Sequence, residues 1–247
     1  MFDHLTVYVL GVIFLATLIR SAFGFGEALV AVPLLALKLP IAVAAPLAVL
    51  VSITVAGVIV AQDWRRVHLA STRWLVTATL FGIPVGLLLL TAGNPRFLKA
   101  AMALIIVAFS AYSLVGRNPP RLDRDSRPWL LTCGFLAGVM GGAYGMNGPP
   151  LAVYGAVRGW SAQQFRATLQ GYFLPASLIG MAGYWIAGLW VSEVTRFYLW
   201  SLPLVFPAIW LGRVLNHRLR GDHFIRYVHV ALVLIGAVLL WQAWRQA

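Results

Sequence analysis

The sequence predicts an all-α polytopic membrane protein that consists of two related halves with inverted topology. Of the 247 residues, 61% are hydrophobic and only 11% are charged, and the mean hydropathy is +0.84. Soluble domains are about 25% charged. Apolar stretches recur almost without pause, and each half contains a glycine-rich interruption. A β-barrel would show alternating apolar and polar residues in segments of about 10, and the sequence has no such segments.

Ten apolar stretches are long enough to form helices, and a helix that spans a bilayer needs about 20 residues. We expect these helices at residues 4–19, 27–37, 41–61, 74–92, 97–115, 129–145, 149–157, 168–190, 197–212 and 224–244. The longest polar connection, 117–128, contains proline and alternating charges, which are typical of a surface linker. It separates a first half, 1–116, from a second half, 129–247, within one membrane domain.

The two halves show a weak internal correspondence. A shift of 121 residues places Gly24 on Gly145, and a shift of 123 residues places Pro84 on Pro207. Each half therefore has a helix pair broken by glycine and proline, followed by three transmembrane helices. We expect the halves to be inverted repeats.

The distribution of Lys and Arg predicts the orientation in the membrane, because cytoplasmic connections carry an excess of positive residues. If each broken pair returns the chain to the side it came from, most of these residues fall on one face. If each broken pair crosses once, they divide evenly. The first arrangement places both termini on the non-cytoplasmic side of the cell membrane. It also accounts for the net charge of +12 without a nucleic-acid partner.

The broken pairs are the most informative features. The first break lies in "RSAFGFGEALVAVP", residues 20–33, and the second in "GMNGPPLAVY", residues 145–154. Within hydrocarbon, irregular backbone is tolerated only where it is packed in protein or lines a cavity. A short helix is expected after each break, and a helix start offers free N–H groups and a partial positive charge. The two starts could converge on one anion near the bilayer midplane. The alternative is that glycine and proline serve only tight helix packing.

Arg20 and Glu27 flank the first break, and charge at membrane depth usually marks a pathway. Arg20 could supply a fixed cation for an anion. Glu27 could pair with Arg20, cap the short helix or carry a coupled proton. The alternative is that Arg20 extends to a lipid headgroup and Glu27 only offsets the helix dipole.

A polar run, "WSAQQFRATLQGYF" at 160–173, begins a later helix. Arg166 and Gln170 are four residues apart and share a helix face. A guanidinium and an amide on one face suit an oxyanion, although an ordinary cytoplasmic loop would also carry such an arginine. Tyr144, Asn147 and Tyr154 could donate hydrogen bonds around the second break.

The sequence offers little support for catalysis or for a bound metal. Cys133 is the only cysteine, which excludes an internal disulfide. No histidine pair has a convincing metal spacing, and no nucleotide-binding or nucleophile motif is present. We therefore expect no enzyme activity, no cofactor and no metal, and a driving force from an ion gradient or the membrane potential.

The motifs "GFGEALVAVPLLAL", "GMNGPPLAVY" and "FRATLQGYF" resemble those of the sulfite exporter TauE/SafE family of membrane permeases. The resemblance implies transport of sulfite or a small organosulfonate, with both Gly/Pro motifs at the substrate site. The family often has a glycine where this chain has Glu27. A carboxylate there would repel an anion unless it were neutralised, for example by Arg20. Together with the charged and amide side chains above, the predicted substrate site comprises Arg20, Gly24, Gly26, Glu27, Pro33, Asn147, Gly148, Pro149, Tyr154, Arg166, Thr168 and Gln170.

The sequence thus predicts a secondary permease for a small anion that works by alternating access in the lipid bilayer. A coupling proton or ion and a homo-oligomer are compatible with this prediction. The alternative is a non-transporting membrane assembly or accessory protein in which the glycine-rich motifs serve helix packing.

Overall fold

The computed structural model describes residues 3–63, 69–115, 126–159, 162–218 and 222–245, and within them every regular element is a helix. Each of the ten apolar stretches contains a helix. The largest differences from the predicted bounds are in α8, which begins at residue 162 instead of 168, and in α9, which spans 192–218 instead of 197–212. The added turns are polar, and hydropathy detects only the apolar part. The helices are α1 (His4–Phe23), α2 (Glu27–Leu35), α3 (Ile41–Asp63), α4 (Leu69–Ala92), α5 (Pro95–Val115), α6 (Arg127–Tyr144), α7 (Gly148–Val157), α8 (Ala162–Ile186), α9 (Ser192–Arg218) and α10 (Asp222–Arg245).

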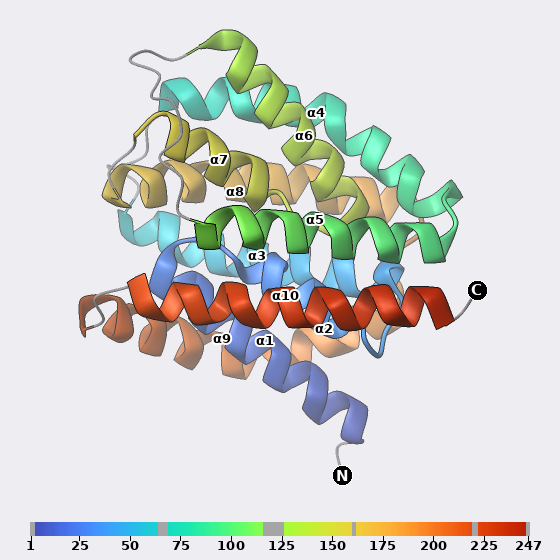
Figure 1. The fold of residues 1–247 in the computed structure, drawn as a ribbon. Coiled ribbons are helices and arrows are strands. Elements are labelled where there is room, and N and C mark those ends of the chain that lie inside the picture. The colour runs from blue at the N-terminus through green and yellow to red at the C-terminus, as the bar shows by residue number, and fades with distance from the viewer. Residues whose placement is uncertain (1–2, 64–68, 116–125, 160–161, 219–221, 246–247) are drawn as a thin grey trace.

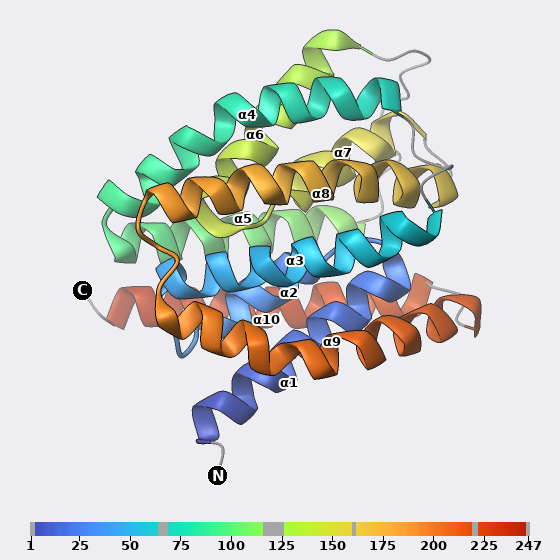
Figure 2. The ribbon, with the colours of Figure 1, turned by 180° about the vertical axis from the view of Figure 1, so that it is seen from behind.

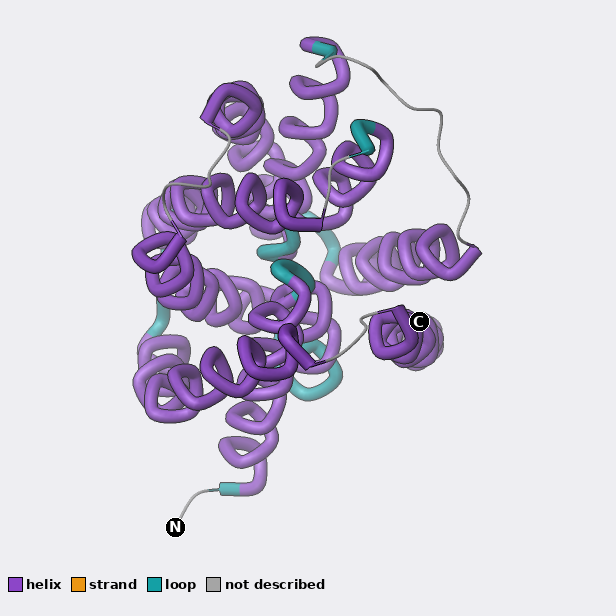
Figure 3. Tube along the Cα trace, turned by 90° about the vertical axis from the view of Figure 1, so that its left-hand side faces the viewer, coloured by secondary structure: helices purple, strands orange, loops and turns teal. Residues whose placement is uncertain are grey.

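The long helices run side by side as one bundle (Figures 1 and 2). α4 and α6 form one edge of the bundle, and α1 and α9 form the opposite edge. α5 packs against α10, and α3 packs against α8. Seen from another direction, loop segments lie in the interior of the bundle with helices around them (Figure 3).

The outer helices are suited to lipid. Within the described part of the chain, five helices are long and apolar enough to cross a membrane: α1, α3, α4, α5 and α9. Large apolar side chains such as Phe81, Ile186 and Trp210 are exposed on the outside of the bundle. In water such a surface would be unfavourable, whereas lipid tails solvate it. The protein is therefore a multi-pass membrane protein.

Both predicted breaks are present, and glycine ends the long helix at each. Gly24 and Gly145 follow α1 and α6 with φ of 87° and 68°. Residues with a Cβ rarely adopt this left-handed backbone conformation, whereas glycine adopts it readily. The short helices α2 and α7 then begin at Glu27 and Gly148, as expected. The shift of 121 residues in the sequence thus relates two glycines with the same structural role.

Other glycines serve helix packing. A Cβ on Gly82 would lie 2.2 Å from the Phe135 carbonyl oxygen, and one on Gly142 would lie 2.3 Å from that of Ile83. Gly134 and Gly138 make similar close approaches, so α4 and α6 touch backbone to backbone along a stripe of small residues. These glycines allow close packing of α4 on α6, whereas Gly24 and Gly145 occupy left-handed backbone at the breaks.

The apolar interior has two parts, and the first break lies where they meet. The larger cluster draws on α1, α2, α3 and α5, and the smaller one is centred on α6, α7 and α8. Phe25, between Gly24 and Gly26, packs against both clusters. The irregular backbone of the break is thus surrounded by protein, as hydrocarbon requires.

Candidate functional site: a small cavity between two helix breaks

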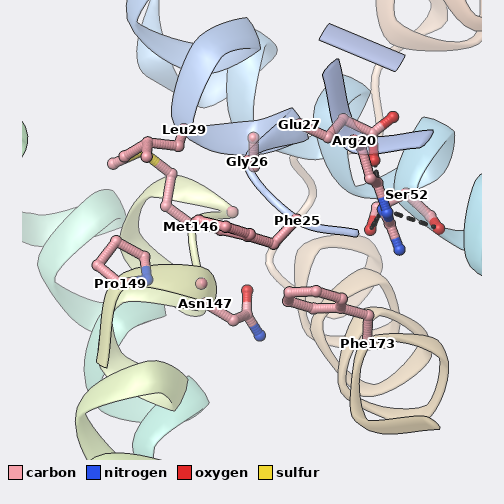
Figure 4. Close-up of a pocket in the computed structure, with 13 residues that line it drawn as sticks. Arg20, Phe25, Gly26, Glu27, Leu29, Ser52, Met146, Asn147, Pro149 and Phe173 are labelled. Atoms are coloured by element: carbon pink, nitrogen blue, oxygen red, sulfur yellow. Dashed lines mark hydrogen bonds and ion pairs between the residues drawn. The ribbon is translucent and has the colours of Figure 1, made fainter. Parts of the chain in front are cut away.

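The two breaks meet around one small cavity (Figure 4). A Cβ placed on Gly148, in the second break, would lie 3.8 Å from the Phe25 ring in the first break. The cavity encloses about 20 Å³ of free space, which is room for about one water molecule. Its lining residues are Arg20, Phe25, Gly26, Glu27, Ala28, Leu29, Ser52, Gly145, Met146, Asn147, Gly148, Pro149 and Phe173.

Arg20 is the centre of the polar contacts. Its side chain is only 2% exposed, although it lies in the last turn of α1. One terminal nitrogen, Nη1, donates to the Glu27 carboxylate and to Ser52 Oγ at 2.7 Å. The other, Nη2, donates to Gln170 Oε1 at 3.0 Å. The expectation that Arg20 extends to a lipid headgroup is therefore wrong, because burial and three polar partners hold it inside the bundle.

Within the described part of the chain, the guanidinium of Arg20 has a donor without a partner, Nε. Its carbon lies 4.9 Å from the centre of the Phe173 ring, a cation–π contact. Its Nε is buried and has no hydrogen-bond partner among the described residues. A buried donor without an acceptor is unfavourable by about 1–3 kcal/mol, and such groups are uncommon outside sites that hold water or a ligand. Arg20 can therefore accept a further anionic group.

Glu27 supplies the opposite charge. It is the first residue of α2 and is 2% exposed. Its carboxylate forms an ion pair with Arg20 and accepts a hydrogen bond from Thr17 Oγ1 at 3.3 Å. Because it stands at a helix start, it also complements the positive end of the α2 dipole. Of the side chains described around the cavity, only these two are charged, so the cavity is neutral overall.

Gln170 connects the later polar run to the first break. Its Oε1 accepts from Arg20, while its Nε2 donates to the Gly24 carbonyl oxygen at 2.7 Å. This pair of bonds fixes the amide and satisfies a carbonyl that the end of α1 leaves free. Gln170 thus positions Arg20 from α8 without lining the cavity itself.

The two helix starts do not contribute equally. At α2, the N–H groups of Glu27, Ala28 and Leu29 are the ones that a helix leaves without internal partners. At α7, Pro149 and the proline after it have no N–H. The second break therefore offers mainly the Gly148 N–H and the amide of Asn147, which also lies 3.4 Å from the Tyr172 hydroxyl.

The structure brings most of the predicted site residues together. Arg20, Gly26, Glu27, Asn147, Gly148 and Pro149 line the cavity, and Gly24 and Gln170 adjoin it through the bond between them. Pro33, Tyr154 and Thr168 are buried but do not line it. The side chain of Arg166 lies outside the described residues. That these twelve residues bind a substrate stays a prediction.

Seven lining residues were not among the predicted site residues: Phe25, Ala28, Leu29, Ser52, Gly145, Met146 and Phe173. Of these, only Ser52, from α3, lies outside the motifs of the sequence analysis. It is hydrogen-bonded to Arg20 and to Ser177 Oγ at 3.2 Å, and the hydroxyls of Ser52 and Thr54 within an apolar span were the available signal for it. Phe173 covers the guanidinium from α8. It is the last residue of the motif "FRATLQGYF", and the sequence analysis did not select it because it considered only the polar residues of that motif.

The fold and the site together define a multi-pass helical membrane protein with a small cavity, lined in part by a buried ion pair, where two helices break. The family model of the sulfite exporter TauE/SafE matches residues 9–239, nearly the whole chain. The chain belongs to this family, which consists of membrane transporters rather than enzymes. No curated protein and no solved structure matches the chain. Among the residues that the structure describes, no group of three His, Cys, Asp or Glu side chains could hold a metal ion.

Proposed function

We propose that the protein is a secondary permease for sulfite or a short organosulfonate, with its substrate site at the cavity between the two breaks. The observation that carries this proposal is the buried Arg20, which lines the cavity and keeps an unpartnered Nε. Family membership supports a sulfite-like anion as the substrate.

The chemistry around the cavity suits a sulfur oxyanion. A guanidinium can bind two oxygens of one anion through a planar fork. The start of α2 offers further N–H donors, and Gly26 has no side chain to keep an oxygen away from them. The Phe25, Met146 and Phe173 side chains, which also line the cavity, would contact a short apolar substituent. A sulfonate presents both kinds of surface.

Transport requires the site to open, and the cavity in this structure has room for about one water only. A sulfonate is several times larger, so the structure represents a closed conformation under this proposal. We propose that the two halves move relative to each other to expose the site alternately on the two sides.

The packing of the helices supports two structurally related halves. Each helix of the first half corresponds to the helix five places later, so that α1 corresponds to α6, α3 to α8 and α4 to α9. The contact of α1 with α9 then corresponds to the contact of α6 with α4, and the contact of α3 with α9 corresponds to that of α8 with α4. All four contacts are present. The pairs α5–α10 and α3–α8 map onto themselves. In Figure 1, α5 and α10 run in opposite directions. Inverted halves would have this arrangement, with the cavity near their common axis.

The alternative, a membrane assembly protein whose glycines serve packing, draws support from the close contact of α4 and α6. It gives no role to the buried Arg20 or to its free donor. The two proposals therefore differ in one measurable respect, which is whether a small anion binds.

The experiment is thermal unfolding of the detergent-purified protein with sulfite, sulfate, methanesulfonate or acetate at matched ionic strength. A ligand that binds only the folded state raises the melting temperature. We expect a selective rise with sulfite or methanesulfonate, followed by uptake of that anion into liposomes. Equal melting temperatures with all four anions, together with no uptake, would favour the assembly protein.

A further inference from the structure

We propose that Glu27 is a proton-binding group of the transport cycle, so that the site takes up one proton with each monovalent anion. This inference rests on the proposed function and adds the coupling ion to it. It follows from the charges and contacts of Arg20 and Glu27.

The first argument is charge balance. Arg20 and Glu27 are both almost fully buried, and their charges cancel. A monovalent anion added beside them would leave a net negative charge inside the bundle. An uncompensated buried charge is unfavourable by several kcal/mol. A proton on Glu27 restores neutrality without moving any other charged group.

The second argument is competition for the guanidinium. The Nη1 N–H groups of Arg20 donate to Glu27 and Ser52, whereas among the described residues Nη2 uses one of its two N–H groups for Gln170 and Nε uses none. An anion bound at Nε and Nη2 would share the positive charge of Arg20 with the Glu27 carboxylate. A hydrogen bond to a charged carboxylate is about twice as strong as a neutral one. Protonation of Glu27 therefore weakens the contact that competes most strongly with the anion.

The third argument concerns the other groups around Glu27. In the described part of the chain, α1 presents Arg20 and Thr17 to it, and α3 presents the neutral Ser52 beside Arg20. α5 and α10 also pack on α2, and there Lys99 donates to Gln242. Arg20 is thus the charged partner of Glu27. When an anion binds to Arg20, the negative charge of Glu27 is no longer required to neutralise the guanidinium.

The uptake of the proton and the binding of the anion form one coupled step, in which the O–H bond of the Glu27 carboxyl group is the only covalent bond that forms. The proton adds to a carboxylate oxygen of Glu27, and the ion pair with Arg20 becomes a neutral contact. The anion then takes its place on the guanidinium. On release the anion leaves, the proton returns to water, and the ion pair forms again. Each cycle carries one negative and one positive charge, so transport of a monovalent anion is electroneutral.

The test is calorimetric titration of the whole protein in detergent with methanesulfonate, whose charge is constant over the working pH range. Titrations in two buffers of different ionisation enthalpy give the number of protons taken up. We expect about one proton per anion and an affinity that falls by up to about tenfold per unit of rising pH. The matched variants are Glu27→Gln and Glu193→Gln, since Glu193 stands at the start of α9 and away from the cavity.

The outcomes are distinct. Glu27→Gln should bind methanesulfonate without proton uptake and with no pH dependence, while Glu193→Gln should behave as the unaltered protein does. Binding without proton uptake by the unaltered protein would overturn this inference and leave the proposed function standing. Proton uptake that persists in Glu27→Gln would overturn it as well. Absence of binding of every tested anion would overturn the proposed function and the inference with it.

Discussion

Arg20 and Glu27 form a buried ion pair across the first helix break, joining the last turn of α1 to the first residue of α2. Only three residues of irregular backbone separate the two helices, and two of them are glycines with positive φ. The same guanidinium also bonds to α3 and α8. The site is therefore held together by the side chain that we propose as the anchor of the substrate.

Replacing Arg20 with Lys should weaken anion binding while keeping the charge. An ammonium is a point charge and cannot hold two oxygens as a planar fork does. We expect the affinity for the best sulfur oxyanion to fall about tenfold to a hundredfold, as loss of one charge-assisted hydrogen bond implies. Calorimetry measures the change. Arg96→Lys, at an exposed position in the first turn of α5, is the control and should bind as before. Equal affinities in the two variants would remove Arg20 from the site.

The ion pair should show strong coupling in stability. Arg20→Met leaves the Glu27 carboxylate buried without its partner, which lowers the free energy of unfolding by about 3–5 kcal/mol. The double variant Arg20→Met with Glu27→Met removes both charges and should recover much of that loss. Denaturant unfolding in detergent gives the values for Arg20→Met, for Glu27→Met and for the double variant. If the losses of the two single variants simply add in the double variant, the residues act independently and the coupling is absent.

Gly145→Ala should destabilise the protein through its backbone. The left-handed conformation is unfavourable by about 1–2 kcal/mol for a residue with a Cβ. The new Cβ would also lie 3.1 Å from the Ala45 carbonyl oxygen and 3.1 Å from the Val49 side chain. Gly57→Ala is the matched control, because a Cβ on this helical glycine meets nothing within 4 Å. We expect a lower melting temperature for the first variant and an unchanged or higher one for the second.

Gly82→Ala should destabilise the contact of α4 and α6 and leave the site intact. Its Cβ would lie 2.2 Å from a backbone oxygen of α6, so the helices must move apart. We expect a loss of about 1–3 kcal/mol, typical of overpacking. The folded fraction should bind the anion with unchanged affinity, because Gly82 is not among the cavity-lining residues. Gly180→Ala, which meets nothing within 4 Å, is the control. A large change in affinity would indicate that this contact shapes the cavity.

The orientation can be tested with reporter fusions. The C-terminal ends of α5 and α10 lie at opposite ends of the bundle (Figure 1). We expect a cytoplasmic signal from a fusion at residue 120 and a non-cytoplasmic signal from a fusion at the C-terminus. The reason is the excess of arginine in the connections on the first side. Signals from the same side would contradict the inverted arrangement, and the opposite assignment would contradict only the orientation.

The sequence by itself determined the helical membrane fold, the ten helices and the positions of the two breaks. These features follow from local properties: apolar length decides which segments enter lipid, and glycine alone readily takes the backbone angles of Gly24 and Gly145. The family motifs likewise lie in short continuous stretches. The polar first turns of α8 and the polar end turns of α9 were missed because they carry no apolar signal.

Only the tertiary structure decided which of these residues meet. The sequence left Arg20 free to extend to a headgroup or to pair with Glu27, because both conformations fit the same turn of α1. The structure decides for the pair, since Ser52 and Gln170 approach from helices that are distant in the chain. It likewise shows that Pro33, Tyr154 and Thr168 stand apart from the cavity. Which side chains share a cavity depends on how the helices cross, and that geometry is set by packing across the whole bundle.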